Sequence, residues 1–125
     1  MKKYNIFLII ILVTLLLAGC KYDFIQPEPV TPIDPNVPVS FATKIAPIFS
    51  TGDKCTSCHK TGGQTPDLTS ANAFSQIVPA FVVLDTPETS KIYTYPGSSS
   101  HSWKAYTAGE ASLVLEWIKQ GAKNN

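Results

Sequence analysis

The sequence of 125 residues contains no arginine, a single methionine and only three cysteines. Its ten positive charges are all lysines, and against nine acidic residues they leave a net charge of +1. Phosphate binding needs clustered cations, so a nearly neutral chain without arginine is a poor candidate for nucleic-acid binding. The methionine is Met1, so no residue inside the chain can supply a thioether ligand to a metal.

The amino-terminal segment has the features of an export signal. Two lysines precede residues 6–17, an apolar run broken only by Thr14. A helix of this length falls short of the roughly 20 residues that span a bilayer, so the run is interpreted as a secretory h-region outside the fold. It ends in Leu-Ala-Gly-Cys at residues 17–20, which resembles the lipobox of bacterial lipoproteins. The resemblance implies cleavage before Cys20 and acylation of Cys20, whereas the alternative is an ordinary signal peptide with an incidental cysteine.

A proline-rich segment follows the predicted lipidation site. Residues 20–38 contain five of the ten prolines, and this composition predicts an extended, semi-rigid spacer. An arm that packs onto the rest of the chain is the alternative. The chain is thereby divided into a signal peptide (1–19), a lipidated cysteine with its linker (20–38) and a body (39–125).

The pattern of the body predicts an all-α domain, because apolar residues recur at helical spacing and no pair of alternating strands is present. Ser40 is the expected N-cap of a first helix over residues 41–49, and Pro47 within it predicts a kink or a short first segment. The clearest element is the last one. Thr107 and Glu110 form a capping box, an apolar face that includes Trp117 follows, and Gly121 is the expected stop.

The middle of the body gives weaker signals. We expect a short helix capped by Thr69 or Ser70 and ending near Pro79, and a second short helix that begins after Thr86. Residues 60–68 and 96–106 are expected to form loops. Residues 81–84 are either a buried connector or one short strand.

Residues 55–59 carry the motif with the clearest chemistry, Cys-Thr-Ser-Cys-His. Two thiols at this spacing can add to the two vinyl groups of one haem, and the adjacent His59 is then a proximal iron ligand. The motif predicts one covalent haem c held by Cys55 and Cys58. A Cys55–Cys58 disulfide and a zinc site made with His59 and His101 are the alternatives.

With this motif the body resembles a single-haem class I cytochrome c, of the short kind found on bacterial envelope lipoproteins. Residues 66–68, Pro-Asp-Leu, look like the Pro-x-Leu that follows the haem motif in that family. The resemblance implies that the Pro66 carbonyl accepts a hydrogen bond from the His59 ring and that Leu68 packs on the haem. An aromatic residue on the closing helix is a further shared feature, and Trp117 occupies that place. The alternative is a loop proline and a core leucine without these roles.

The sequence departs from the family at the sixth iron ligand, which is usually a methionine in the loop before the last helix. That loop contains His101, which we predict to be the distal ligand. An imidazole in place of a thioether should lower the reduction potential. A solvated loop histidine, with water, Lys91 or Lys104 at the sixth position, is the alternative. Tyr93, Tyr95, Trp103 and Tyr106 surround this loop, and we interpret them as core and rim packing. The alternatives are that they line the haem crevice or form a docking face.

The predicted function is electron transfer by a monomeric, lipid-anchored cytochrome of the bacterial cell envelope, on the periplasmic side or the cell surface. Its partners are expected to be the membrane and redox proteins, without nucleic acid. No acid–base pair or activated nucleophile is recognisable, so an enzyme is not expected. Two alternatives remain: a haem-binding sensor with an open sixth position, and a structural lipoprotein that haem stabilises.

Overall fold

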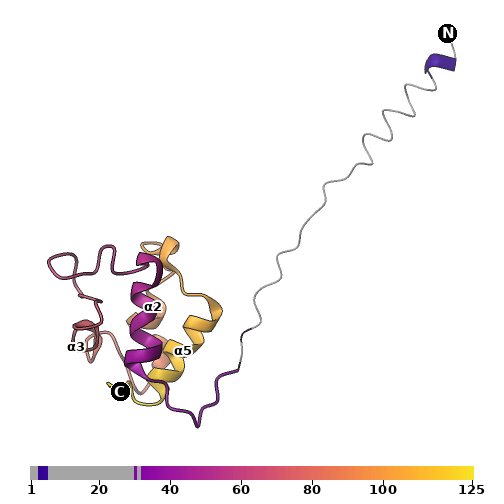
Figure 1. Ribbon diagram of the computed structural model, residues 1–125. Helices are drawn as coiled ribbons and strands as arrows, with labels where there is room; N and C mark the ends of the chain where they lie inside the picture. Colours follow the sequence, from indigo (N-terminus) through magenta and orange to yellow (C-terminus); the bar gives the residue numbers. More distant parts are fainter. Residues whose placement is uncertain (1–2, 6–29, 31) are drawn as a thin grey trace.

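The computed structural model describes residues 3–5, residue 30 and residues 32–125 (Figure 1). Over these residues the chain forms short helices and irregular loops, and none of them lies in a β-strand. The prediction of a helical body is confirmed at this level. The h-region, Cys20 and most of the linker lie outside the described residues. Within the part that is described, no helix has the length and apolar character to cross a membrane.

The first helical segment changes its winding just before Pro47. A π-helical turn, η1 (Phe41–Ile45), leads directly into α2 (Ala46–Ser50), with Ser40 Oγ accepting a hydrogen bond from Thr43 N at 3.3 Å. The wider turn pairs the Ala46 amide with the Phe41 carbonyl. Pro47 then falls in the first turn of α2, where its missing N–H costs no helical hydrogen bond. The predicted cap and the predicted irregularity at the proline are both confirmed.

The closing helix α5 (Ala108–Lys119) follows its sequence signals closely. Thr107 Oγ1 accepts from Glu110 N at 3.2 Å, and the Glu110 carboxylate accepts from Thr107 N at 2.8 Å. Gly121, with φ of 93°, stands just after the helix in a left-handed conformation that favours glycine. The capping box and the stop are confirmed.

The short elements between these helices differ from the prediction in two places. Helix α3 (Ala73–Ile77) begins three residues after the expected caps, because Thr69 instead bonds to the Asp67 carboxylate. The helix expected after Thr86 is divided into η3 (Pro87–Thr89) and α4 (Lys91–Thr94) by Ser90, whose backbone is extended. Ser90 is fully buried, and its Oγ accepts from Val83 N at 3.0 Å.

Two further short turns complete the fold. They are η2 (Thr51–Asp53), which includes a left-handed Gly52, and η4 (Ser102–Lys104) in the loop before α5. Residues 81–84 form an irregular connector and no strand, but the prediction of a buried connector is wrong for its second half, because Val83 and Leu84 are exposed.

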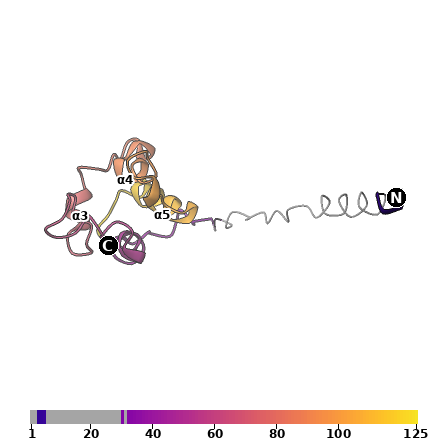
Figure 2. The same ribbon diagram turned by 90° about the horizontal axis from the view of Figure 1, so that it is seen from above.

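One hydrophobic core joins the two ends of the body. Trp117 of α5 is 1 % exposed and packs against Phe41 of η1, with ring centroids 5.3 Å apart. Figure 1 shows α5 beside the segment formed by η1 and α2, and Figure 2 shows α5 beside α4. Asn125 reinforces this junction, because its side-chain and main-chain oxygens accept from the amides of Phe41 and Ala42. The core thus lies where η1, α4 and α5 meet.

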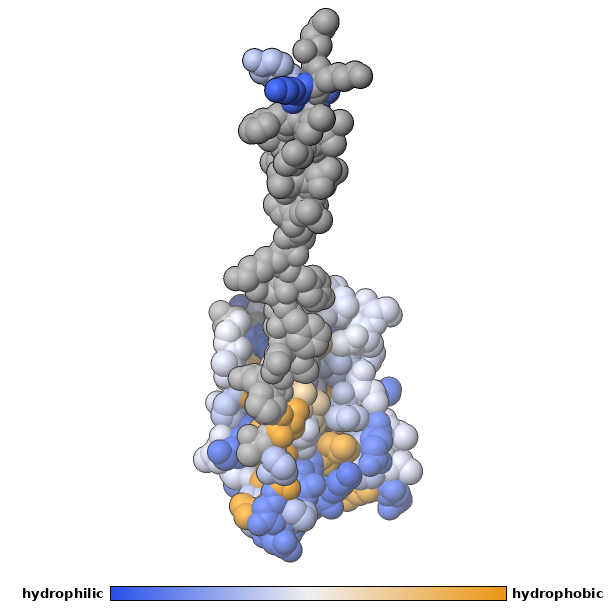
Figure 3. Space-filling view, turned by 90° about the vertical axis from the view of Figure 1, so that its right-hand side faces the viewer, coloured by the Kyte–Doolittle hydropathy of each residue, from blue (hydrophilic) through white to orange (hydrophobic). Residues whose placement is uncertain are grey.

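The described end of the linker lies on this core rather than apart from it. Gln120 Nε2 donates to the carbonyls of Pro35 and Val37, at 3.3 and 3.1 Å, while its Oε1 accepts from Val39 N at 2.8 Å. Ile33 packs against the core as well. Residues 33–39 therefore form an arm that packs onto the body, which was the alternative to an extended spacer. Elsewhere, the face of the body in Figure 3 is mainly hydrophilic with small hydrophobic patches.

Candidate functional site

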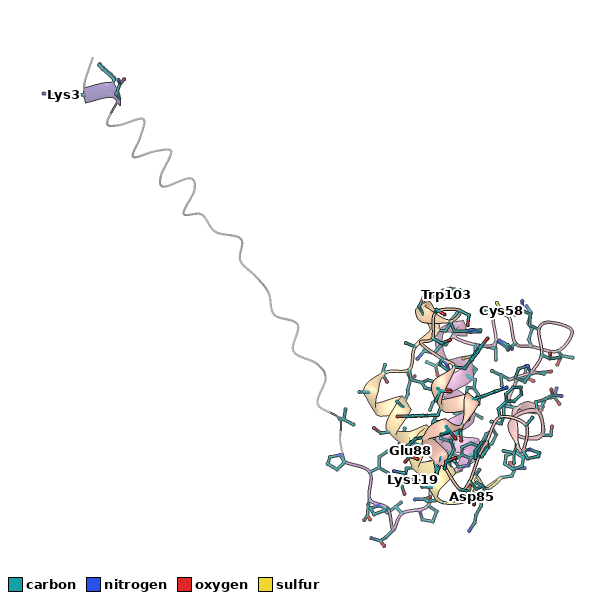
Figure 4. The ribbon with its side chains drawn as sticks, turned by 180° about the vertical axis from the view of Figure 1, so that it is seen from behind. Lys3, Cys58, Asp85, Glu88, Trp103 and Lys119 are labelled. Carbon is teal, nitrogen blue, oxygen red and sulfur yellow. The ribbon has the colours of Figure 1, made fainter. Side chains whose placement is uncertain are left out.

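The cysteine motif opens onto a cavity of about 690 Å³. This volume is within the range of about 300–1,000 Å³ that small-molecule and cofactor sites occupy. The cavity brings together all the site residues predicted within the body: Cys55, Cys58, His59, Pro66, Leu68 and His101. Figure 4 shows Cys58 and Trp103 at one end of the body and Asp85, Glu88 and Lys119 at the other. Cys20, the remaining predicted site residue, lies outside the described residues.

The loop that carries the cysteines is fixed by the end of the first helix. The Phe49 carbonyl accepts from the amides of Cys55 and Thr56 at 2.9 and 3.1 Å. The Cys55 carbonyl then accepts from the amides of Cys58 and His59, so the motif forms one helix-like turn. Cys55 is half-buried, Cys58 is exposed, and both are free thiols without a disulfide between them. Burial raises the pKa of the Cys55 thiol, although Lys54 and Lys104 oppose this.

The ring of His59 is held by the loop that follows the motif. His59 Nδ1 lies 3.0 Å from the Pro66 carbonyl oxygen, which has no hydrogen to donate, so Nδ1–H is the donor. This tautomer leaves Nε2 with its lone pair, which is the form that binds a metal. Leu68 N donates to the His59 carbonyl at 2.9 Å, and the Leu68 side chain is buried in the cavity wall. Of these contacts, the one between His59 Nδ1 and the Pro66 carbonyl is the one that the resemblance implied. Participation in haem binding stays a prediction.

His101 approaches His59 from a distant part of the chain. The two imidazole centroids are 6.1 Å apart and their planes are inclined by 32°. With metal–imidazole bonds of about 2.0 Å on opposite sides of one ion, the centroids would be about 6 Å apart. His101 Nδ1 contacts Ser100 Oγ at 3.3 Å, and no hydrogen bond joins Nε2 of either ring to another described residue. The residues present therefore fit a group that holds a metal between two histidines.

Asp67 is a structural residue of the site that the sequence interpretation did not single out. Its carboxylate accepts hydrogen bonds from Thr69 N, Thr69 Oγ1, Thr61 Oγ1 and Asn72 Nδ2, at 2.6–2.9 Å. The hydrogen bond from Thr61 and those from Thr69 hold the pKa of this carboxyl far below its usual range. Asp67 thereby closes the loop that carries Pro66 and Leu68. The Asp-x-Thr spacing of an Asx turn was the available signal.

A second polar contact connects the motif to α5. Lys54, next to Cys55, donates to the Glu110 carboxylate at 2.5 Å. Burial raises the pKa of Glu110, but the hydrogen bonds from Lys54 and Thr107 outweigh it and the net pKa is lowered. Glu110 thus serves the capping box and the motif loop together.

The four aromatic residues near the His101 loop divide between core and rim. Tyr93 and Tyr106 pack against the core, and Tyr106 OH donates to the Ile92 carbonyl at 3.0 Å. Burial raises the pKa of Tyr106 well above its ordinary value. Tyr95 and Trp103 are 51 % and 74 % exposed at the cavity mouth. Tyr95, Trp103 and Tyr106 also line the cavity, so these residues combine packing with the crevice-lining alternative.

The zinc alternative gains no support from the side chains. In the described part of the chain, no group of three or more histidine, cysteine, aspartate or glutamate residues is arranged to hold a metal ion.

Comparison of the chain with protein-family models, with curated proteins and with solved structures found no match.

Proposed function

We propose that the protein is a membrane-anchored c-type cytochrome with one covalent haem, which transfers electrons in the bacterial cell envelope. One observation carries the proposal. The Cys-x-x-Cys-His motif lines a cofactor-sized cavity, and in this cavity the ring centroids of His59 and His101 are 6.1 Å apart. A motif that occurred by chance would not be expected to have both this cavity and a second imidazole at a ligating distance.

The bound haem would supply an iron atom that exchanges one electron between its ferric and ferrous forms. The chain's own residues would hold and shield it. Cys55 and Cys58 would provide the thioether links, and His59 the proximal ligand. The Pro66 carbonyl fixes the tautomer and ring orientation of His59, as partners of metal-bound histidines generally do. The Leu68 side chain excludes water from the cavity wall.

The position of His101 favours electron transfer over a ligand-binding sensor. A sensor needs a sixth position that is open or easily vacated, whereas His101 lies at the distance from His59 that two ligands of one iron require. Lys104 is less suited to this position because its Nζ donates to Ser57 Oγ at 3.4 Å. A lipid on Cys20 would then confine the domain near membrane partners and raise their effective concentration.

Covalent haem attachment is tested by producing the full chain, with its signal, in a bacterial host that carries the haem-attachment machinery. We expect haem that resists denaturation and acid extraction and gives a c-type pyridine haemochrome. The matched control is the double variant C55A/C58A, which should retain no covalent haem. A wild-type chain that is exported but carries no covalent haem would overturn the proposal.

The distal ligand is tested by His101→Ala, with Ser102→Ala as the control that keeps the imidazole and its contact with Ser100. We expect His101→Ala to lose the low-spin visible and electron paramagnetic resonance spectra and to bind carbon monoxide in the ferrous form. His101→Met should keep a filled sixth position and raise the midpoint potential, because a thioether is the softer ligand. An unchanged low-spin spectrum in His101→Ala would exclude His101 as the ligand and show that another group fills the sixth position.

A further inference from the structure

Two exposed aromatic rings lie next to the His101 imidazole. The Tyr95 ring lies 4.8 Å from it, centroid to centroid, at an angle of 54°. The Trp103 ring lies 6.4 Å away and is nearly parallel, at 11°. Tyr95 is 51 % exposed and Trp103 is 74 % exposed, so neither ring is explained by burial in the core. What Tyr95 and Trp103 have in common is a ring contact with the His101 imidazole.

Three main-chain hydrogen bonds of the same loop involve His101. The His101 carbonyl accepts from Gly97 N at 3.1 Å and from Lys104 N at 2.9 Å, while the His101 amide donates to the Ser98 carbonyl at 2.9 Å. Gly97 has φ of 89°, and a Cβ placed there would approach Ala105 Cβ to 3.3 Å. The loop conformation therefore depends on glycine at this position, and it presents the imidazole from a defined turn.

We propose that Tyr95 and Trp103 form an aromatic clamp that positions the His101 ring and keeps it at the sixth position of the iron. This proposal rests on the proposed function and adds what controls access to the iron. The loop main chain fixes the Cα of His101, but two side-chain torsions remain free to rotate the ring away. The neighbouring Tyr95 and Trp103 rings restrict these torsions. The clamp thus makes the site a closed electron carrier and keeps small ligands such as carbon monoxide out.

The test measures carbon monoxide binding to the ferrous haem protein and the low-spin resonance spectrum of the ferric protein. Tyr95→Ala and Trp103→Ala each remove one ring, whereas Tyr95→Phe keeps the ring and removes only the hydroxyl. An aromatic contact of this kind shifts an equilibrium by about 2- to 12-fold, so each alanine variant should bind carbon monoxide more readily by about that factor. Tyr95→Phe should behave as the wild type does. Leu84→Ala is the matched control, because Leu84 is also exposed (54 %) and lies outside the cavity wall.

The resonance spectrum distinguishes a change in the orientation of the His101 ring from a general loosening of the domain. Its g-values depend on the relative orientation of the two imidazole planes, which are inclined by 32° in the structure. We expect broadened or shifted g-values in Tyr95→Ala and an unchanged spectrum in Leu84→Ala. Gly97→Ala, which strains the loop and leaves both rings in place, should also increase carbon monoxide binding.

The possible failures are distinguishable. Wild-type behaviour of Tyr95→Ala and Trp103→Ala in both measurements, with His101→Ala altered, would overturn the clamp and leave the proposed function intact. An unaltered His101→Ala variant would overturn the clamp together with the assignment of His101. Absence of covalent haem from the wild type would overturn both proposals.

Discussion

The contact between Lys54 and Glu110 gives a prediction that is independent of any cofactor. It joins the residue before Cys55 to the first turn of α5, and both side chains are 21 % exposed. Glu110 also completes the capping box by accepting from Thr107 N. The two roles can be separated by substitution, because glutamine serves at this box position as well as glutamate does, whereas alanine does not.

The expected magnitudes follow from these contacts. A hydrogen bond to a charged group contributes about 1.5–3 kcal/mol when buried, and partial exposure reduces this to about 1 kcal/mol. Loss of the cap adds about 1 kcal/mol. We therefore expect Glu110→Gln to lower the free energy of unfolding by about 1 kcal/mol and Glu110→Ala by about 2 kcal/mol. For a domain of this size these losses correspond to a decrease in Tm of roughly 4–8 °C and 8–16 °C.

The assay is urea unfolding of the full chain in detergent, followed by far-ultraviolet circular dichroism, with Lys54→Met and the Lys54→Met/Glu110→Gln pair completing a double-mutant cycle. Since the folded-state pKa of Glu110 is lowered, its stabilising contribution is complete above the ordinary carboxyl pKa and is lost as the pH falls through the folded-state value. The difference between wild type and Lys54→Met should therefore disappear at acidic pH. A coupling energy of zero at neutral pH, or a difference that persists in acid, would refute the reasoning.

Three further predictions concern the core, the loop after the motif and the arm. Trp117→Ala removes a buried ring and leaves the Lys123 carbonyl without its 2.9 Å donor, so it should lower the free energy of unfolding by about 3–5 kcal/mol, measured by denaturant unfolding. Asp67→Ala should raise amide hydrogen exchange at Thr69, whose N–H it releases, whereas Asp67→Asn should raise it less. Gln120→Ala should make residues 33–39 sensitive to protease while Lys119→Ala, at an exposed salt bridge, should not; equal sensitivity would contradict the role of Gln120.

The parts of the fold that the sequence predicted are those whose determinants lie within a few residues of one another. The capping box of α5 depends on Thr107 and Glu110, three positions apart, and the first cap depends on Ser40 and Thr43. The cysteine motif is equally local. Each of these signals joins side chains to backbone groups within one helical turn, so their outcome changes little with tertiary context.

The parts that the sequence did not predict depend on distant or competing partners. Helix α3 starts late because the Asp67 carboxylate binds Thr69, which would otherwise have capped the helix. Ser90 interrupts the next helix because its hydroxyl pairs with the backbone of Val83 inside the core. The arm is fixed by Gln120, more than 80 residues from its acceptors. No local pattern reports such partners, which become adjacent only when the chain folds.

The candidate site combines both kinds of determinant, and this bears on how the body is stabilised. Its His59 wall comes from a local motif, while its His101 wall comes from a loop more than 40 residues later, and a cavity of about 690 Å³ separates them. The cavity opens to solvent at its mouth, where Tyr95 and Trp103 are 51 % and 74 % exposed. The cavity must therefore hold either water or an apolar group. Phe49, Leu68 and Ile92 are already buried in its wall, and the covalent haem that we propose would link the His59 wall to the His101 wall. In a body of 87 residues, that haem would add apolar bulk to a core of modest size.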